Sequence, residues 1–381
     1  NVDCLVCHDN TKTYRKAKGN AGYPHASGPQ KPDYSYVAQH VGDPTKHNCG
    51  VCHFFSGGGN NVKHGDLEKA LWDCSRDVDV HMAAEGQNMA CVDCHDAEKH
   101  NIPGKLYSVS STNTDRLHCS KCHTEAPHYD NTLNKHTSKV SCQTCHIPEY
   151  AKVNATKMYW DWSTAGKLDG NGQPYHTEDK WGNHDYLSIK GSFVWEKHVE
   201  PEYYWFNGTA DHALIQDKFE EEDMPIQINT LYGGYADGKI YPVKVHRGKQ
   251  IFDPVNKTLI QPDLWAKKKG EGAYWKDFDW DQAAKNGMEL MGMPYSGEYT
   301  FVETEMYWPV NHMVAPAEKS LTCKECHSRD GRLEELDGFY MPGRNHNASL
   351  DLMGTLLIIF SLAGVLIHGF LRILTARKLK K

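Results

Sequence analysis

The sequence has no block rich in lysine or arginine outside its last ten residues, and its formal net charge of −7 is small for 381 residues. Both features argue against nucleic-acid binding. Hydrophobic residues are also scarce, because the mean hydropathy is −0.67, although a chain of this length usually forms about two or three domains. We therefore expect material other than side chains to fill part of the core.

Cysteines outside one repeated pattern are nearly absent: of 13 cysteines, twelve lie in six copies of Cys-x-x-Cys-His. In each copy the two cysteines can form thioethers to one porphyrin, and the histidine that follows can bind its iron. Neither a zinc ribbon nor a disulfide framework requires that histidine. The sequence predicts six covalently attached c-type haems, at Cys4, Cys7 and His8; Cys49, Cys52 and His53; Cys91, Cys94 and His95; Cys119, Cys122 and His123; Cys142, Cys145 and His146; and Cys323, Cys326 and His327.

The motifs divide the chain into regions. Residues 1–148 hold five motifs, so these haems must lie near contact and form a wire. Residues 149–320 hold no motif but nine of the ten tryptophans. Their weak periodicity predicts extended loops with a few short strands or helices, wrapped against the haems and supplying distal ligands. Residues 321–350 hold the sixth motif and a polar connector. The expected fold class is mainly α and irregular coil around a packed haem array.

A single transmembrane helix is predicted over residues 351–373. It contains a run of about twenty uncharged residues, which is long enough to span a bilayer. Basic residues cluster after this run, which predicts a cytoplasmic C-terminus. They are Arg372 and, within the basic tail at 374–381, Arg377, Lys378, Lys380 and Lys381. Because thioether attachment occurs outside the cytoplasm, we expect the haem domain to be periplasmic. A cleaved anchor or a buried core helix is the alternative.

Histidines are abundant, with seventeen outside the motifs. This surplus favours a second histidine as the sixth iron ligand. Methionine ligation through Met82, Met89 or Met313 is the alternative.

Several segments around these histidines resemble the octahaem tetrathionate reductase family of multihaem c-type cytochromes. The likeness runs from about residue 3 to about residue 333 and is carried by residues 48–54, 62–67, 79–82, 141–148, 244–250 and 306–316. The resemblance implies a pool of distal ligands consisting of His64, His81, His100, His128, His136, His246 and His312.

The chain also departs from that family. The family carries eight haems, and its substrate-binding haem is attached through a motif that ends in lysine, whereas this chain has six motifs and no Cys-x-x-Cys-Lys. The chain begins without Met or a signal peptide. We therefore expect either about two further haems upstream or a shortened member that only conducts electrons.

Two further features have two interpretations each. Cys74, the one cysteine outside the motifs, is either a buried thiol or a sulfur placed for chemistry near a haem. Lys244, His246, Arg247 and Lys249 either bind an oxyanion of sulfur or nitrogen, the substrates that the resemblance implies, or belong to a solvated, salt-bridged strand.

The leading functional interpretation is a membrane-anchored cytochrome that transfers electrons between a quinone-linked partner and a periplasmic or extracellular one. The expected partners are a membrane cytochrome b or quinone-reactive subunit and other c-type cytochromes, in a multisubunit complex. His368 is expected to face the membrane partner. The alternative is the catalytic subunit of a tetrathionate, nitrite or hydroxylamine oxidoreductase whose active-site haem lies upstream, and no catalytic residue is predicted within the chain. A structural element of an extracellular cytochrome assembly is a third interpretation.

Overall fold

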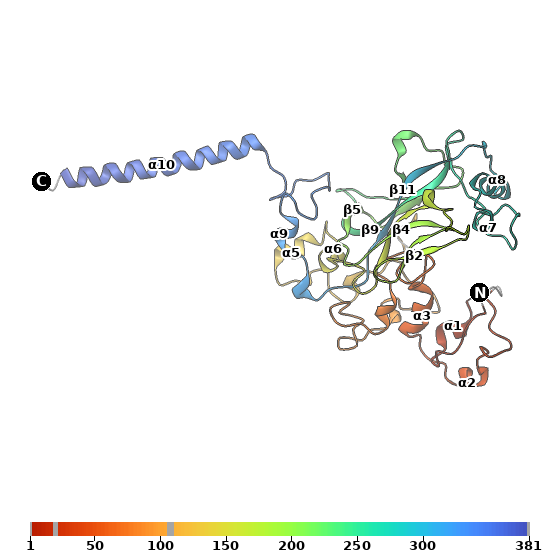
Figure 1. The fold of residues 1–381 in the computed structure, drawn as a ribbon. Coiled ribbons are helices and arrows are strands. Elements are labelled where there is room, and N and C mark those ends of the chain that lie inside the picture. The colour runs from red at the N-terminus through yellow and green to blue at the C-terminus, as the bar shows by residue number, and fades with distance from the viewer. Residues whose placement is uncertain (1, 18–21, 105–109, 379–381) are drawn as a thin grey trace. The chain divides into compact units, whose positions relative to one another are not determined.

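The computed structural model describes residues 2–17, 22–104 and 110–378 (Figure 1). It contains two compact units, Asn1–Leu321 and Thr322–Lys381.

The N-terminal part of the first unit consists of short helices joined by irregular chain. A short helix brings two cysteines three positions apart onto one face, beside the histidine that follows. Side-chain caps start these helices: Asp3 accepts the N–H of Leu5 at 3.1 Å, and Asp93 accepts that of Ala90 at 2.7 Å. The helices are α1 (Cys4–His8), α2 (Tyr34–Gln39), α3 (Lys46–His53), η1 (Lys69–Trp72), α4 (Cys91–Cys94), η3 (Cys119–Lys121), α5 (Asn131–His136) and α6 (Cys142–His146).

A mixed sheet of nine strands follows, so the expectation of a mainly α fold is wrong. The strand order is β2-β3-β4-β1-β9-β11-β7, and β5 and β10 also pair with β9. The β1–β9 and β11–β7 pairs are parallel, whereas the other pairs are antiparallel. The strands are β1 (Thr156–Asp161), β2 (His176–Glu178), β3 (His184–Leu187), β4 (Gly191–Glu196), β5 (Glu202–Phe206), β7 (Ile226–Gln227), β9 (Lys239–Asp253), β10 (Thr258–Leu259) and β11 (Thr300–Pro309). A separate pair joins β6 (Ala210–His212) and β8 (Asn229–Leu231).

The long central strand β9 shows why the sheet was not predicted. Residues 240–245 are all buried, so the strand lacks the alternation of apolar and polar residues that marks a half-exposed strand. A short, continuously buried run cannot be told from a buried helix by its periodicity.

Three apolar clusters stabilise the first unit, and one of them joins Val243 and Val245 of β9 to Tyr307 of β11. Another lies between the motif region and the sheet and includes Phe54, Leu71, Tyr150, Val310 and Met313. The third packs α7 (Tyr274–Asp277) and α8 (Trp280–Leu290) against β9. The short helices η4 (Trp162–Thr164), η5 (Glu221–Asp223) and η6 (Ala317–Lys319) complete the unit.

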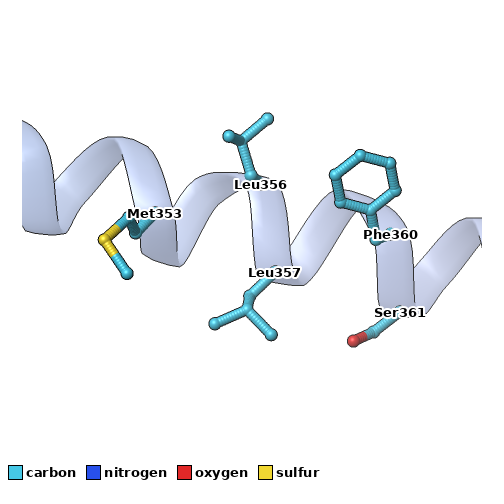
Figure 2. A pocket seen from close by; sticks show the side chains of 5 residues that line it. All are labelled: Met353, Leu356, Leu357, Phe360 and Ser361. Carbon is cyan, nitrogen blue, oxygen red and sulfur yellow. The ribbon is translucent and has the colours of Figure 1, made fainter.

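The second unit contains α9 (Cys323–Cys326) and the long helix α10 (Ala348–Lys378). By length and composition α10 can cross a membrane. Figure 2 shows Met353, Leu356, Leu357 and Phe360 projecting from it, and the apolar part of the helix is not buried against other described residues. Of the predicted basic cluster, Lys380 and Lys381 lie outside the described residues.

Candidate haem centres

Four motif histidines each face a second histidine that lies outside the motifs. Two imidazoles bound to one metal ion through bonds of about 2 Å place their ring centres roughly 6 Å apart. The observed ring centres are separated by 6.2 Å for His8 and His100, 6.0 Å for His123 and His81, 6.4 Å for His95 and His312, and 6.1 Å for His146 and His128. The residues therefore fit haem iron held between two histidines, and all four partners belong to the predicted distal pool.

Hydrogen bonds at Nδ1 fix the orientation of several of these rings. A histidine that binds a metal through Nε2 usually donates its Nδ1–H to an oxygen. Nδ1 lies 2.8 Å from the Gly42 carbonyl oxygen for His8, 2.9 Å from that of Pro103 for His95, 3.3 Å from Asn134 Oδ1 for His128 and 3.1 Å from Asp66 Oδ2 for His312. Gly104, at φ +95°, leaves room for the His95 ring, because a Cβ there would lie 2.9 Å from it.

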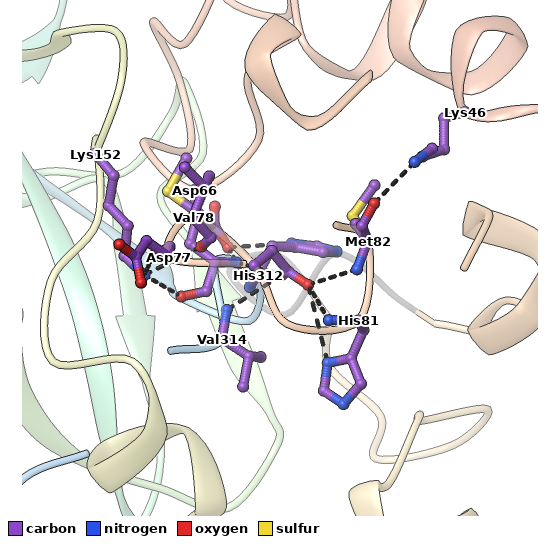
Figure 3. A network of polar contacts seen from close by, with 11 residues as sticks. Lys46, Asp66, Asp77, Val78, His81, Met82, Lys152, His312 and Val314 are labelled. Carbon is purple, nitrogen blue, oxygen red and sulfur yellow. Dashed lines mark hydrogen bonds and ion pairs between the residues drawn. The ribbon is translucent and has the colours of Figure 1, made fainter. Parts of the chain in front are cut away.

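The buried carboxylate of Asp66 holds one distal ligand. It accepts the backbone N–H groups of Asn311 and His312 at 2.8 and 2.9 Å, in addition to the His312 ring. Burial disfavours a charged imidazole, but the hydrogen bond to Asp66 raises the pKa of His312 overall. Figure 3 shows the His312 ring beside Asp66. Asp66 therefore orients His312 toward His95.

The carboxylate of Asp79 connects two distal-ligand segments. Its Oδ1 accepts the backbone N–H groups of His81 and Met82, each at 2.9 Å. Its Oδ2 accepts those of Met313 and Val314 at 2.9 and 3.1 Å. Because Asp79 is only 3% exposed, these bonds are shielded from water. One carboxylate thus positions both segments together.

Lys152 strengthens the same connection. Its Nζ donates to the carbonyl oxygens of Asp77 and Val78, each at 3.1 Å, and of Met313 at 2.9 Å (Figure 3). Sequence reasoning missed Asp66, Asp79 and Lys152. The only signal for Asp66 is its place two residues after His64, and the only signal for Asp79 is its place two residues before His81.

The first three motifs are neighbours in space. Before haem attachment, burial raises the pKa of the Cys7 thiol, and the nearby Cys49 and Cys52 raise it further. A hydrogen bond with Cys91 raises the pKa of the Cys49 thiol. The second motif therefore lies between the first and the third.

The row continues through the fourth and fifth motifs. Burial raises the pKa of Cys94, and the nearby Cys122 raises it further. A hydrogen bond with Cys142 raises the pKa of Cys119. The five attachment sites of the first unit thus follow one another in space in their sequence order, as a wire requires.

His53 differs from the other motif histidines of the first unit. Within residues 2–17, 22–104 and 110–378, no second imidazole faces it as in the four pairs. Burial and then the nearby His312 lower its pKa.

The remaining members of the distal pool are placed as follows. His64 packs edge-on against Trp308, with ring centres 5.0 Å apart, and His246 Nδ1 lies 3.1 Å from the Lys157 carbonyl oxygen. His136 Nδ1 lies 2.8 Å from the Thr132 carbonyl oxygen. Their roles as iron ligands stay predictions. In the second unit, His327 Nδ1 lies 2.8 Å from the Pro342 carbonyl oxygen.

Lys244 is used internally. It is fully buried, and its Nζ donates to the carbonyl oxygens of Val62 and Lys63 at 2.9 and 3.1 Å and to Thr156 Oγ1 at 2.6 Å. With its three donors occupied, it has none left for a substrate anion.

Arg247 and Lys249 are paired with carboxylates on the opposite face of β9. Arg247 makes two bonds to Glu202 at 2.6 and 2.9 Å and one to Glu305 at 2.9 Å, and Lys249 lies 3.4 Å from Glu303. Residues of opposite parity on a strand point to opposite faces. The structure therefore does not bring the predicted cationic group together around one anion.

The sulfur-containing candidates also lie in structural positions. Cys74 is 5% exposed and belongs to the cluster between the motifs and the sheet, where burial raises its pKa. Met313 is fully buried in the same cluster. In the four imidazole pairs the motif histidine faces a second histidine, and methionine ligation stays an untested alternative.

The chain is similar to known cytochromes. The family model described as bacterial cytochrome c matches residues 157–330. A crystal structure of octahaem cytochrome c from Shewanella oneidensis is 45% identical, with a TM-score of 0.76, and the match covers 87% of this chain and 73% of that one. An uncharacterized protein of Archaeoglobus fulgidus is 28% identical over 115 residues, or 27% of this chain. The chain spans 38% of the length of this curated relative.

Proposed function

The chain belongs to the multihaem c-type cytochromes, and we propose that it transfers electrons between a quinone-linked membrane partner and a periplasmic or extracellular redox partner. Within that group, the finer proposal is kinship with the octahaem tetrathionate reductases. We also propose six haems for the chain, one at each motif.

The four imidazole pairs carry the proposal. When bound, haem c supplies a one-electron iron couple whose potential depends on its axial ligands. In each pair the two histidines would hold the iron from both sides and would leave no coordination site for a substrate. Asp66, Asp79 and Lys152 keep the distal segments fixed, so little reorganisation is needed between oxidation states. The ordered, closely spaced attachment sites therefore favour electron transfer from haem to haem over catalysis at a haem.

The helix α10 supports membrane attachment. Its apolar side chains would be covered by lipid or by another membrane helix. A single span cannot by itself bind quinone and reduce haems outside the membrane. We therefore propose a membrane cytochrome b or another quinone-reactive subunit as the partner, with α10 as its contact and the haem domain on the periplasmic side.

A catalytic role is the second candidate, and His53 is the observation that favours it. Without a facing imidazole, the haem at Cys49 and Cys52 would keep one axial position for a small ligand. Tetrathionate, nitrite and hydroxylamine are the substrates that the family resemblance suggests. The lysine-ended motif of that family is absent from the sequence.

Two measurements on the membrane-bound protein distinguish the candidates. Electron transfer predicts EPR spectra dominated by low-spin iron and fast reduction of the c-haems by a quinol in native membranes. Predominantly high-spin spectra, or quinol reduction no faster than in membranes lacking the protein, would overturn the first proposal. Binding of carbon monoxide to one reduced haem, together with turnover of one of the three substrates, would establish the second.

A further inference from the structure

A cluster of metal-binding side chains lies on the β2–β3 hairpin, and neither the haems nor their ligands use it. His176, Glu178 and His184 each offer one ligand atom, and these atoms all lie within 4.8 Å of one another. His184 Nδ1 is 3.8 Å from Glu178 Oε1, and the two imidazole ring centres are 4.8 Å apart.

The strand geometry explains why the three side chains meet. His176 and Glu178 are two positions apart on β2, so their side chains share one face of the strand. Glu178 pairs with His184 on β3 across the antiparallel ladder, and directly paired residues have neighbouring side chains. The register shift between Thr177 and Glu178 brings His184 opposite the carboxylate.

The turn that joins the strands is held in place by Asp179. Its carboxylate accepts the backbone N–H groups of Trp181 at 2.8 Å and Asn183 at 2.9 Å. Asp179 N–H donates to the Asn183 carbonyl oxygen at 2.8 Å. Trp195 on β4 donates its Nε1–H to the carbonyl oxygen of His184 on β3 at 2.8 Å. The backbone that carries the ligands is therefore rigid before any ion binds, which lowers the entropic cost of binding.

We propose that His176, Glu178 and His184 bind a zinc ion. Two imidazoles and one carboxylate are a ligand set that zinc uses, with a fourth position for water. Ligand atoms around tetrahedral zinc lie about 3.3 Å apart, so small side-chain rotations bring the observed atoms into place. The residues are exposed or half-buried, which gives the ion access from solvent. The site is independent of the proposed electron-transfer function.

The test is a titration of the haem-loaded full-length protein with zinc chloride, in which isothermal calorimetry measures the stoichiometry and the affinity. The wild-type protein should bind one more zinc ion than the His176→Gln, Glu178→Gln or His184→Gln variant, or bind it at least roughly tenfold more tightly. His212→Gln is the matched control, because His212 is an exposed strand histidine outside the cluster. It should behave like the wild type.

Zinc K-edge X-ray absorption of the one-equivalent complex gives a second measurement. Imidazole scattering in the wild type that weakens in His184→Gln and not in His212→Gln supports the site. Unchanged haem spectra in each variant show that the fold is intact. Equal zinc affinity and stoichiometry in all four variants and the wild type would overturn the proposal and leave His184 and Glu178 as an ion pair.

Discussion

The buried carboxylate of Asp66 accepts the Nδ1–H of His312 at 3.1 Å and the backbone N–H of the same residue at 2.9 Å. A carboxylate bonded to a ligand histidine increases the basicity of the ring and favours the more positive, oxidised iron. We therefore expect Asp66 to lower the reduction potential of the haem held by His95 and His312.

Replacing Asp66 with asparagine should raise that potential by roughly 60–130 mV, the equivalent of the charge-assisted hydrogen bond that is lost. A redox titration followed by EPR measures the shift for each low-spin haem. Asp77→Asn is the control, since the Asp77 side chain is 67% exposed and pairs with Lys319. If Asp66→Asn leaves every potential unchanged, the carboxylate does not tune this centre.

The His128→Ala variant should convert one low-spin haem into a high-spin one. His128 and His146 have nearly parallel rings 6.1 Å apart, so a haem iron held between them would lose one of its two histidines. EPR spin quantification measures the change. His198→Ala should leave the spectrum unchanged, because His198 is half-exposed and contacts Glu149. A spectrum of His128→Ala identical to the wild type would show that another residue binds this iron.

Lys152→Met should destabilise the protein by about 2–4 kcal/mol, because three carbonyl oxygens, two of them in buried hydrogen bonds, lose their donor. Denaturant unfolding of the haem-loaded protein measures the difference. Lys319→Met is a matched control at the same loop, since Lys319 contacts Asp77 from an exposed position at 2.8 Å. It should cost less than about 1 kcal/mol. Equal losses for the two variants would contradict the structural role of Lys152.

Every motif is complete, so intact-mass measurement of the denatured chain should show six haem additions. Substituting Cys119 and Cys122 together with serine should remove one addition. A wild-type mass with fewer than six haems would identify a motif that remains unloaded.

In α10, His368→Leu preserves the apolar character of the span but removes its ionisable side chain. If His368 contacts the membrane partner, the variant should lose the co-purifying b-haem and reduce the c-haems more slowly with quinol. His346→Leu, which lies before the helix, is the control. Retention of the b-haem at an unchanged rate would show that His368 only reaches the lipid headgroups.

The motifs and the long apolar helix could be predicted because each depends on residues that are adjacent in the sequence. Cys91, Cys94 and His95 specify a haem by spacing alone. The pairing of His95 with His312 could not be predicted, because it depends on how the chain between them folds. The resemblance supplied His312 as a candidate but not the haem that it serves.

The sheet and the carboxylate network were missed for different reasons. The buried residues 240–245 conceal the strand period of β9. Asp66 and Asp79 lie close to histidines in the sequence, yet their main acceptor contacts are with backbone N–H groups of residues 311–314. Contacts with the backbone leave no signature in the identity of the residues that donate.

The separation of 246 positions between Asp66 and His312 also sets an order of events during biogenesis. Because the chain is made from its N-terminus, the third motif exists long before the segment that supplies the histidine facing His95. Until β11 has paired with β9, the segment that follows β11 does not hold His312 beside His95. A haem attached at the third motif would therefore gain a second histidine only when nearly the whole sheet has formed.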